Sequence, residues 1–202
     1  MIAVIDYDAG NLKSVEKALA YLGETPVITR DREELLAADK VILPGVGAFG
    51  DAMERLHQYG LVDVIKEIVK KGTPFLGICL GLQLMFESSE ESPGVEGLGL
   101  LPGKILKIPE APGMKVPHMG LELPESTSGF QIVSGHSRWQ LCIFCPFLLS
   151  ESRIRRYCSS YYGIRDTYSR SSRERKPVRL PVHPEKSSQT GLKILENFIK
   201  LS

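Results

Sequence analysis

Gly77-Ile78-Cys79-Leu80-Gly81 is the stretch of this sequence that decides the fold. It follows the short apolar run Thr73–Leu76, which is typical of a buried strand, and it precedes Leu82–Phe86, which has the character of a helix start. A reactive side chain between two glycines at a strand-to-helix turn is the pattern of a nucleophile elbow, here with Cys in place of Ser. The glycines permit a tight turn that a Cβ would obstruct, so we expect the Cys79 side chain to lie above the sheet edge.

Two interpretations of Cys79 follow from these residues. A helix that begins directly after it would direct backbone N–H groups and the positive end of its dipole at the sulfur, which favours the thiolate. A buried cysteine in a glycine-rich turn fits equally well, because many cysteines act as small hydrophobic residues. The rest of the chain has to decide between them.

Composition limits the class of protein. The 202 residues suffice for one α/β domain, and 43% hydrophobic and 24% charged residues are ordinary for a globular protein. A net charge of +1 argues against a dominant nucleic-acid or membrane surface, and no apolar run reaches the length of a membrane span. The acidic Asp6 stands where a signal peptide would continue its apolar run. The four cysteines do not suggest a disulfide framework. We therefore expect a cytoplasmic protein.

Strands and helices are expected to alternate along the chain, which predicts a doubly wound α/β fold with a mostly parallel central sheet, of the flavodoxin-like kind. The expected strands are Ile2–Asp6, Pro26–Thr29, Lys40–Leu43, Phe75–Ile78 and Gly103–Ile108. The expected helices are Asn11–Leu22, Arg32–Ala37, Ala48–Gln58, Leu61–Lys71 and Gly191–Leu201, and Glu87–Gly94 is expected to be a polar loop. Ligands of such folds bind at the carboxyl ends of the strands, so Pro44–Gly47 and Gly77–Gly81 are expected to face one another.

A cysteine hydrolase also needs a base, an orienting acid and an oxyanion hole. His183 and Glu185 are the best base and acid, because residues two apart in an extended segment point to the same side. The same residues are also compatible with a structural role, with His183 as a surface histidine and Glu185 as a solvated charge at the start of a helix. Pro44–Gly47 offers peptide N–H groups that suit an oxyanion hole, and it is equally compatible with an ordinary strand-ending turn. The other histidines are less suited, namely His57, His118 and His136.

Five segments occur together in one order and at one spacing: Asp6–Asn11, Pro44–Gly50, Gly77–Gln83, Pro117–Gly120 and His183–Ser187. In this combination the sequence resembles the glutamine amidotransferase subunits of imidazole glycerol phosphate synthase, which are class I (triad) amidotransferases. The resemblance covers residues 1–120 and 183–202. The Gly-Ile-Cys-Leu-Gly-x-Gln motif is shared by the whole class. The resemblance to this particular subunit rests on three other segments, namely Asp6–Asn11, Pro-Gly-Val-Gly-Ala-Phe-Gly and Pro-His-Met-Gly.

The resemblance implies a role for each matching residue. Cys79 resembles the nucleophile, His183 the general base and Glu185 the third member of the triad. The amides near Val46 and of Leu80 resemble the oxyanion hole, and the family's Pro-Gly-Val-Gly peptide is thought to flip into place on activation. Three further positions match those that hold the glutamine substrate, namely Gly47, Gln83 and Glu91.

The implied reaction is hydrolysis of glutamine through a γ-glutamyl thioester. The ammonia would pass to a separate (β/α)₈ cyclase subunit that forms imidazole glycerol phosphate in histidine biosynthesis. No metal, organic cofactor, nucleic acid or membrane is implied. Two alternatives remain, namely another triad amidotransferase subunit such as that of anthranilate synthase, and a catalytically inactive scaffold that binds the cyclase.

Residues 121–182 depart from the family pattern. The family continues Pro-His-Met-Gly with Trp-Asn, and later carries Val-His-Ser-Tyr and a Gln-Phe directly before His-Pro-Glu-Lys; none of these is present. Suitable codons for Leu121–Pro124, Trp139–Leu149 and Pro177–Val182, translated one base later, produce Trp-Asn, Val-His-Ser-Tyr and Gln-Phe. We therefore hypothesise that 121–182 is a frame-shifted part of a single 1–202 domain, and expect the chain as written to pack poorly there.

Two motifs lie inside this segment. Cys142-x-x-Cys145 resembles half of a zinc site but lacks a second pair, and eight arginines between Arg153 and Arg179 could suggest nucleic-acid binding. Under the frame-shift hypothesis neither motif belongs to the gene's intended product.

Overall fold

The computed structural model describes residues 1–107, 148–151 and 188–201 of the chain. Within them lies a parallel sheet of four strands in the order β2-β1-β3-β4. The strands are β1 (Ile2–Ile5), β2 (Val27–Thr29), β3 (Lys40–Leu43) and β4 (Phe75–Gly77). Parallel strands of this kind are covered on both faces, which explains why β1 and β4 are apolar throughout.

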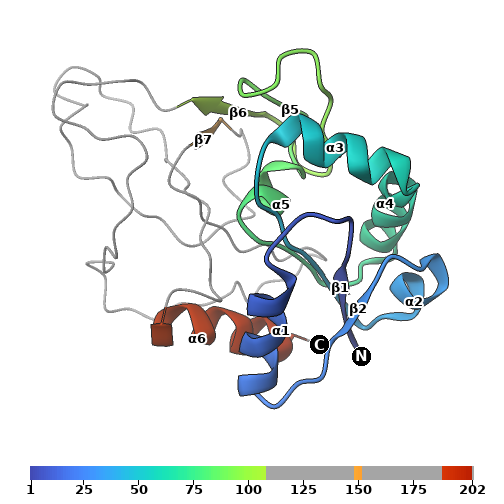
Figure 1. Cartoon of the computed structure of the whole chain (residues 1–202), viewed down its shortest axis with the longest axis vertical. Coiled ribbons are helices and arrows are strands. Elements are labelled where there is room, and N and C mark those ends of the chain that lie inside the picture. Colours follow the sequence, from blue (N-terminus) through green and yellow to red (C-terminus); the bar gives the residue numbers. More distant parts are fainter. Residues whose placement is uncertain (108–147, 152–187, 202) are drawn as a thin grey trace, which may run out of the picture.

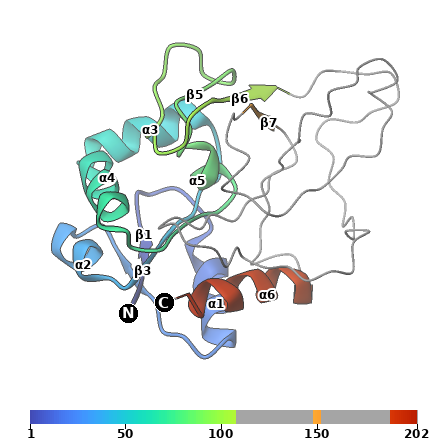
Figure 2. The same cartoon turned by 180° about the vertical axis from the view of Figure 1, so that it is seen from behind.

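Helices cover both faces of the sheet (Figure 1). On one side are α2 (Arg32–Ala37), α3 (Phe49–Gln58) and α4 (Leu61–Lys71), whose apolar residues share a core cluster with Ala3, Ile5, Val41 and Leu43. On the other side α1 (Leu12–Tyr21) and α6 (Ser188–Ile199) share a second cluster with Ile2, Val4 and Ile42. Figures 1 and 2 both show α1 and α6 side by side. The alternation of side chains along each strand divides the core into two layers.

Local signals explain where these helices begin and end. The Asp31 side chain accepts hydrogen bonds from the amides of Glu33 and Glu34 at 2.9 and 3.0 Å, which satisfies N–H groups at the start of α2. Helix α4 lies between Gly60 and Gly72, which are both left-handed and so terminate helical geometry without strain. The predicted bounds of α2, β3 and α4 are confirmed residue for residue, and the predicted α/β fold class is confirmed.

The direction of the strand order reverses between β1 and β3. The chain leaves β1 toward β2 on one side and later continues through β3 to β4 on the other. In a doubly wound sheet the loops at such a switch point form the ligand crevice. Here they are the loop of residues 6–11, which follows β1, and residues 44–48, which follow β3.

The region after the elbow differs from the prediction. Helix α5 (Leu80–Gln83) is a single turn, and the expected polar loop contains strand β5 (Ser88–Ser89). The carbonyls of Leu84 and Met85 accept bonds from the amides of Leu98 and Leu101, at 2.7 and 2.9 Å, instead of from amides four residues ahead. The 98–101 segment therefore takes the acceptors that a longer helix would need.

A second sheet contains β5, β6 (Lys104–Lys107) and β7 (Leu148–Glu151) in that order. Strand β5 is parallel to β6, and β7 is antiparallel to it with Lys104 opposite Glu151. Of residues 121–182, only those of β7 are among the residues that the structure describes.

Within that described part, no helix combines the length and the apolar character needed to cross a lipid bilayer.

Candidate active site

Cys79 lies directly after β4 and caps the N-terminal end of α5. Its backbone has φ 53° and ψ −115°, and its side chain is buried, with 7% of the residue exposed. Such a conformation is unfavourable for a residue with a Cβ and persists only when the surroundings enforce it. The expected strand–turn–helix around Cys79 is confirmed. Because α5 is one turn long, however, its dipole is weaker than the sequence suggested.

The glycines on either side enforce this geometry. A Cβ on Gly77 would lie 2.7 Å from the Cα of Leu82, and a Cβ on Gly81 would lie 1.9 Å from the carbonyl oxygen of Leu43. Both contacts are far inside van der Waals distance. Gly77 therefore packs tightly against the start of the following helix, and Gly81 packs tightly against the end of β3.

Residues 44–48, here called the 44–48 segment, pass beside the elbow. A Cβ on Gly45 would lie 2.5 Å from the Gly81 nitrogen and 2.8 Å from the Leu80 Cβ. The amide of Ile78 donates to the carbonyl of Leu43 at 2.9 Å, which fixes the two chain ends together. The prediction that these two turns face one another is confirmed. Val46, expected near the oxyanion hole, is 41% exposed.

Among the three residues expected to hold substrate, Glu91 lies beside the start of α3, which is close in sequence to Gly47. The Glu91 carboxylate accepts from the amide of Phe49 at 3.4 Å, at the start of α3 and two residues after Gly47. Gln83 occupies the end of α5 and is only 3% exposed.

Tyr7 is a site residue that the sequence did not indicate. Its side chain is fully buried, and its hydroxyl donates to the carbonyl of Pro44 at 2.8 Å. Burial raises the pKa of Tyr7 well above its ordinary value, and the electrostatic interaction with Cys79 raises this pKa further. The hydroxyl therefore remains a donor at every pH at which the protein would be studied.

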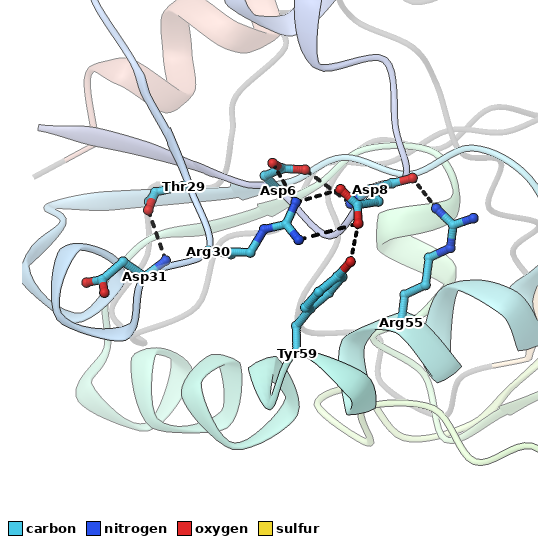
Figure 3. Close-up of polar contacts among 7 residues, drawn as sticks. All are labelled: Asp6, Asp8, Thr29, Arg30, Asp31, Arg55 and Tyr59. Atoms are coloured by element: carbon cyan, nitrogen blue, oxygen red, sulfur yellow. Dashed lines mark hydrogen bonds and ion pairs between the residues drawn. The ribbon is translucent and has the colours of Figure 1, made fainter.

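An ion-pair cluster holds the loop of residues 6–11 (Figure 3). Arg30, directly after β2, donates to Asp6 at 2.9 Å and to Asp8 at 2.6 Å, and its guanidinium lies 4.2 Å from the centre of the Tyr59 ring. The Tyr59 hydroxyl also donates to the Asp8 carboxylate, and Arg55 donates to the Asp8 carbonyl. The loop is thereby tied to β2 and to the C-terminal end of α3.

These partners shift the acidity of Asp8. Hydrogen bonds from Arg30, and then from Tyr59, lower the pKa of the Asp8 carboxyl to about 2. The hydrogen bonds of Arg30 to Asp8, and then to Asp6, raise the pKa of Arg30 above its ordinary value. Asp8 has a φ of 58°, which is uncommon for a residue other than glycine. Its hydrogen bonds with Arg30, Tyr59 and Arg55 hold it in this conformation.

His183 and Glu185 lie outside the described residues, as do His118, His136 and the three cysteines of the 121–182 segment. His57 is exposed on α3. Helix α6 begins shortly after Glu185, and its residues Leu195 and Phe198 pack in the apolar cluster that contains Cys79. Among the described side chains, no group of three or more His, Cys, Asp or Glu residues is placed to hold a metal ion.

Comparison with known proteins identifies the family. Residues 3–138 match the model of the family described as glutamine amidotransferase class-I. The chain is 43% identical to imidazole glycerol phosphate synthase subunit HisH of Thermosynechococcus vestitus, over 99% of this chain and 96% of that protein. It is 43% identical to the subunit of the same name from Moorella thermoacetica, over 99% and 94% of the two chains. For that of Methanothermobacter thermautotrophicus the identity is 40%, over 100% and 98%.

The elbow, the adjacent glycine-rich segment and these matches agree with one another. The chain therefore belongs to the class-I glutamine amidotransferases and, among them, to the amidotransferase subunits of imidazole glycerol phosphate synthase.

Proposed function

We propose that this protein hydrolyses glutamine with Cys79 as nucleophile and delivers the ammonia to a cyclase subunit. The observation that carries the proposal is the conformation of Cys79, a non-glycine residue at φ 53° between two glycines that no larger residue could replace without displacing backbone. Strain at a reactive side chain is typical of nucleophile elbows. The partner would be the (β/α)₈ cyclase of the same synthase, in a cytoplasmic heterodimer.

In the proposed reaction, the sulfur of Cys79 attacks the carboxamide carbon of glutamine while His183 accepts the thiol proton. His183 then gives this proton to the departing amide nitrogen, the C–N bond breaks, ammonia leaves and the γ-glutamyl thioester of Cys79 is formed. Water next attacks the thioester carbon while His183 accepts a proton from the water. The C–S bond breaks, His183 returns the proton to the sulfur, and glutamate is released. Glu185 would orient His183 and stabilise its charged form.

The amides near Val46 and of Leu80 would stabilise the tetrahedral oxyanion. The close packing of Gly45 against Leu80 and Gly81 supports this assignment, because the 44–48 segment lies directly beside the elbow. Gly47, Gln83 and Glu91 would hold the glutamine substrate.

A glutaminase assay with and without the cyclase subunit tests the proposal. We expect ammonia release that depends on the cyclase and that falls at least about a thousandfold in Cys79→Ala, as for removal of a covalent nucleophile. Cys158→Ala removes a thiol elsewhere and should leave the rate unchanged in the chain as written. Cys79→Ala with the cyclase should still form product when ammonium chloride is added, which shows that the cyclase in the assay is active.

We also propose that residues 121–182 are a frame-shifted stretch within one amidotransferase domain. The proposal is supported by the three family motifs that return under a single shift of the reading frame. Resequencing the gene tests it, and an intact frame encoding the chain as written would refute it. In that case, cyclase binding without ammonia release would indicate a scaffold instead of an enzyme.

A further inference from the structure

The start of the 44–48 segment is anchored in the core. Tyr7 lies just beyond the end of β1, and its hydroxyl reaches across the switch point of the sheet to the Pro44 carbonyl at 2.8 Å. A Cβ on Gly10, in the same loop, would lie 3.2 Å from the Pro44 Cβ, so the 6–11 loop also packs against this residue. The hydrogen bond and the contact both act on Pro44, at the upstream end of the segment.

The downstream end is anchored where α3 begins. The first amides of a helix have no partners within it. Ser92 satisfies one of them, because its hydroxyl oxygen accepts from the amide of Gly50 at 3.0 Å. The Glu91 carboxylate lies 3.4 Å from the amide of Phe49. The segment therefore enters α3 through residues that are held from the 89–92 turn.

Between these anchors the segment is closely packed at Gly45 and open at Val46 and Gly47. Gly45 is pressed against the Gly81 nitrogen and cannot move independently of the elbow. Val46, in contrast, is 41% exposed, and Gly47 has a φ of 95° with no heavy atom within 4 Å of the position of a Cβ. Rotation of the peptides on either side of Gly47 therefore meets little steric resistance.

We infer that Tyr7 and Ser92 are positioning residues that clamp the two ends of the 44–48 segment and confine its rotation to the peptides around Val46 and Gly47. The inference rests on the proposed function, in which an amide near Val46 stabilises the oxyanion. With fixed ends, only a few rotations separate an amide directed at the elbow from one directed away. With one end released, the donor samples many orientations and is placed correctly for a smaller fraction of time.

Steady-state glutaminase kinetics of the full chain with its cyclase provide the first test. Tyr7→Phe removes only the hydroxyl, and we expect kcat to fall about tenfold with KM within about twofold, because the oxyanion forms only in the transition state. Ser92→Ala should lower kcat about threefold, and Ser92→Thr, which keeps a hydroxyl, should restore it. Tyr21→Phe is the matched control, since Tyr21 is 78% exposed on α1 and remote from the segment. Wild-type kcat in Tyr7→Phe would overturn the inference.

Hydrogen exchange measured by mass spectrometry provides the second test and does not depend on activity. In Tyr7→Phe we expect the amides of residues 45–50 to exchange about tenfold faster, while those of residues 77–84 are unchanged. Equal acceleration in both peptides would mean general loosening of the core, and no acceleration would mean that Tyr7 clamps nothing; either result overturns the inference. If the wild-type complex releases no ammonia, the proposed function fails, and hydrogen exchange alone decides the inference.

Discussion

The elbow and the 44–48 segment lie side by side, yet they are restrained in opposite ways. Around Cys79, a Cβ on Gly77 or Gly81 would collide with backbone atoms at 2.7 and 1.9 Å. Around Gly47, a Cβ would meet no heavy atom within 4 Å. The elbow is thus sterically confined at both of its glycines, whereas the 44–48 segment is open at Val46 and Gly47.

This difference suggests a division of labour between the two turns. A nucleophile must stay within bonding distance of its target in every turnover, so steric confinement is useful there. Oxyanion donors act only while charge develops, and a donor that can turn toward or away from the site allows activity to be controlled. The positive φ of Cys79 records the strain of the first turn, and the exposed Val46 marks the freedom of the second.

The largest difference between the two turns is expected when one glycine in each is replaced by alanine. Gly81→Ala should destabilise the protein by about 4 kcal/mol or more, because its Cβ would meet the Leu43 carbonyl oxygen and the backbone must shift. Gly47→Ala should cost only about 1 kcal/mol, from the φ of 95° alone. Thermal unfolding of both variants measures the difference, and equal losses of stability would contradict the description of the two turns.

A smaller effect isolates the strain at Cys79. Cys79→Gly should be more stable than Cys79→Ala by about 1 kcal/mol, because Gly adopts φ 53° without strain and this gain exceeds its entropic cost. The usual order is the reverse, and Glu16 in the middle of α1 supplies the control, where Gly should be less stable than Ala by about 1 kcal/mol. Denaturant unfolding compares the two pairs. If Ala were the more stable residue at both positions, the elbow would carry no strain.

The smallest effect concerns Asp8 in the loop of residues 6–11, whose carboxylate is held by Arg30 and Tyr59. The pKa of Asp8 is lowered to about 2 in the folded chain, against about 3.9 for an unfolded aspartate. Its stabilising contribution is therefore complete above about pH 4 and is lost as the pH falls through 2. Asp8→Asn should lower Tm slightly at neutral pH and should flatten the fall of Tm between pH 4 and pH 2.

The effect is small because half of the Asp8 side chain is exposed and solvent weakens its ion pairs. High salt should reduce the difference between wild type and Asp8→Asn, since screening acts on exposed charges. The difference between Gly81→Ala and wild type should not respond to salt, because it has a steric cause. A salt-dependent defect in Gly81→Ala would contradict that assignment.

Local patterns in the sequence were sufficient for most of the architecture. Apolar runs and glycine stops predicted β3, α2 and α4 to the residue, and the glycines around Cys79 predicted the elbow, because each signal acts over a few neighbouring residues. The same signals failed after Gln83. The carbonyls of Leu84 and Met85 accept hydrogen bonds from the amides of residues 98 and 101, so the helix ends there. The periodicity of neighbouring residues does not predict contacts with so distant a segment.

The candidate site divides in the same way. The sequence by itself determined that Cys79 sits in a strained turn and that Pro44 begins a glycine-rich turn at the end of a neighbouring strand, because residue type and spacing decide both. Only the tertiary structure decided that Tyr7 donates to Pro44, that Ser92 holds the start of α3 and that Arg30, Arg55 and Tyr59 converge on Asp8. Those contacts join segments far apart in the chain, and the order of strands in the sheet brings them together.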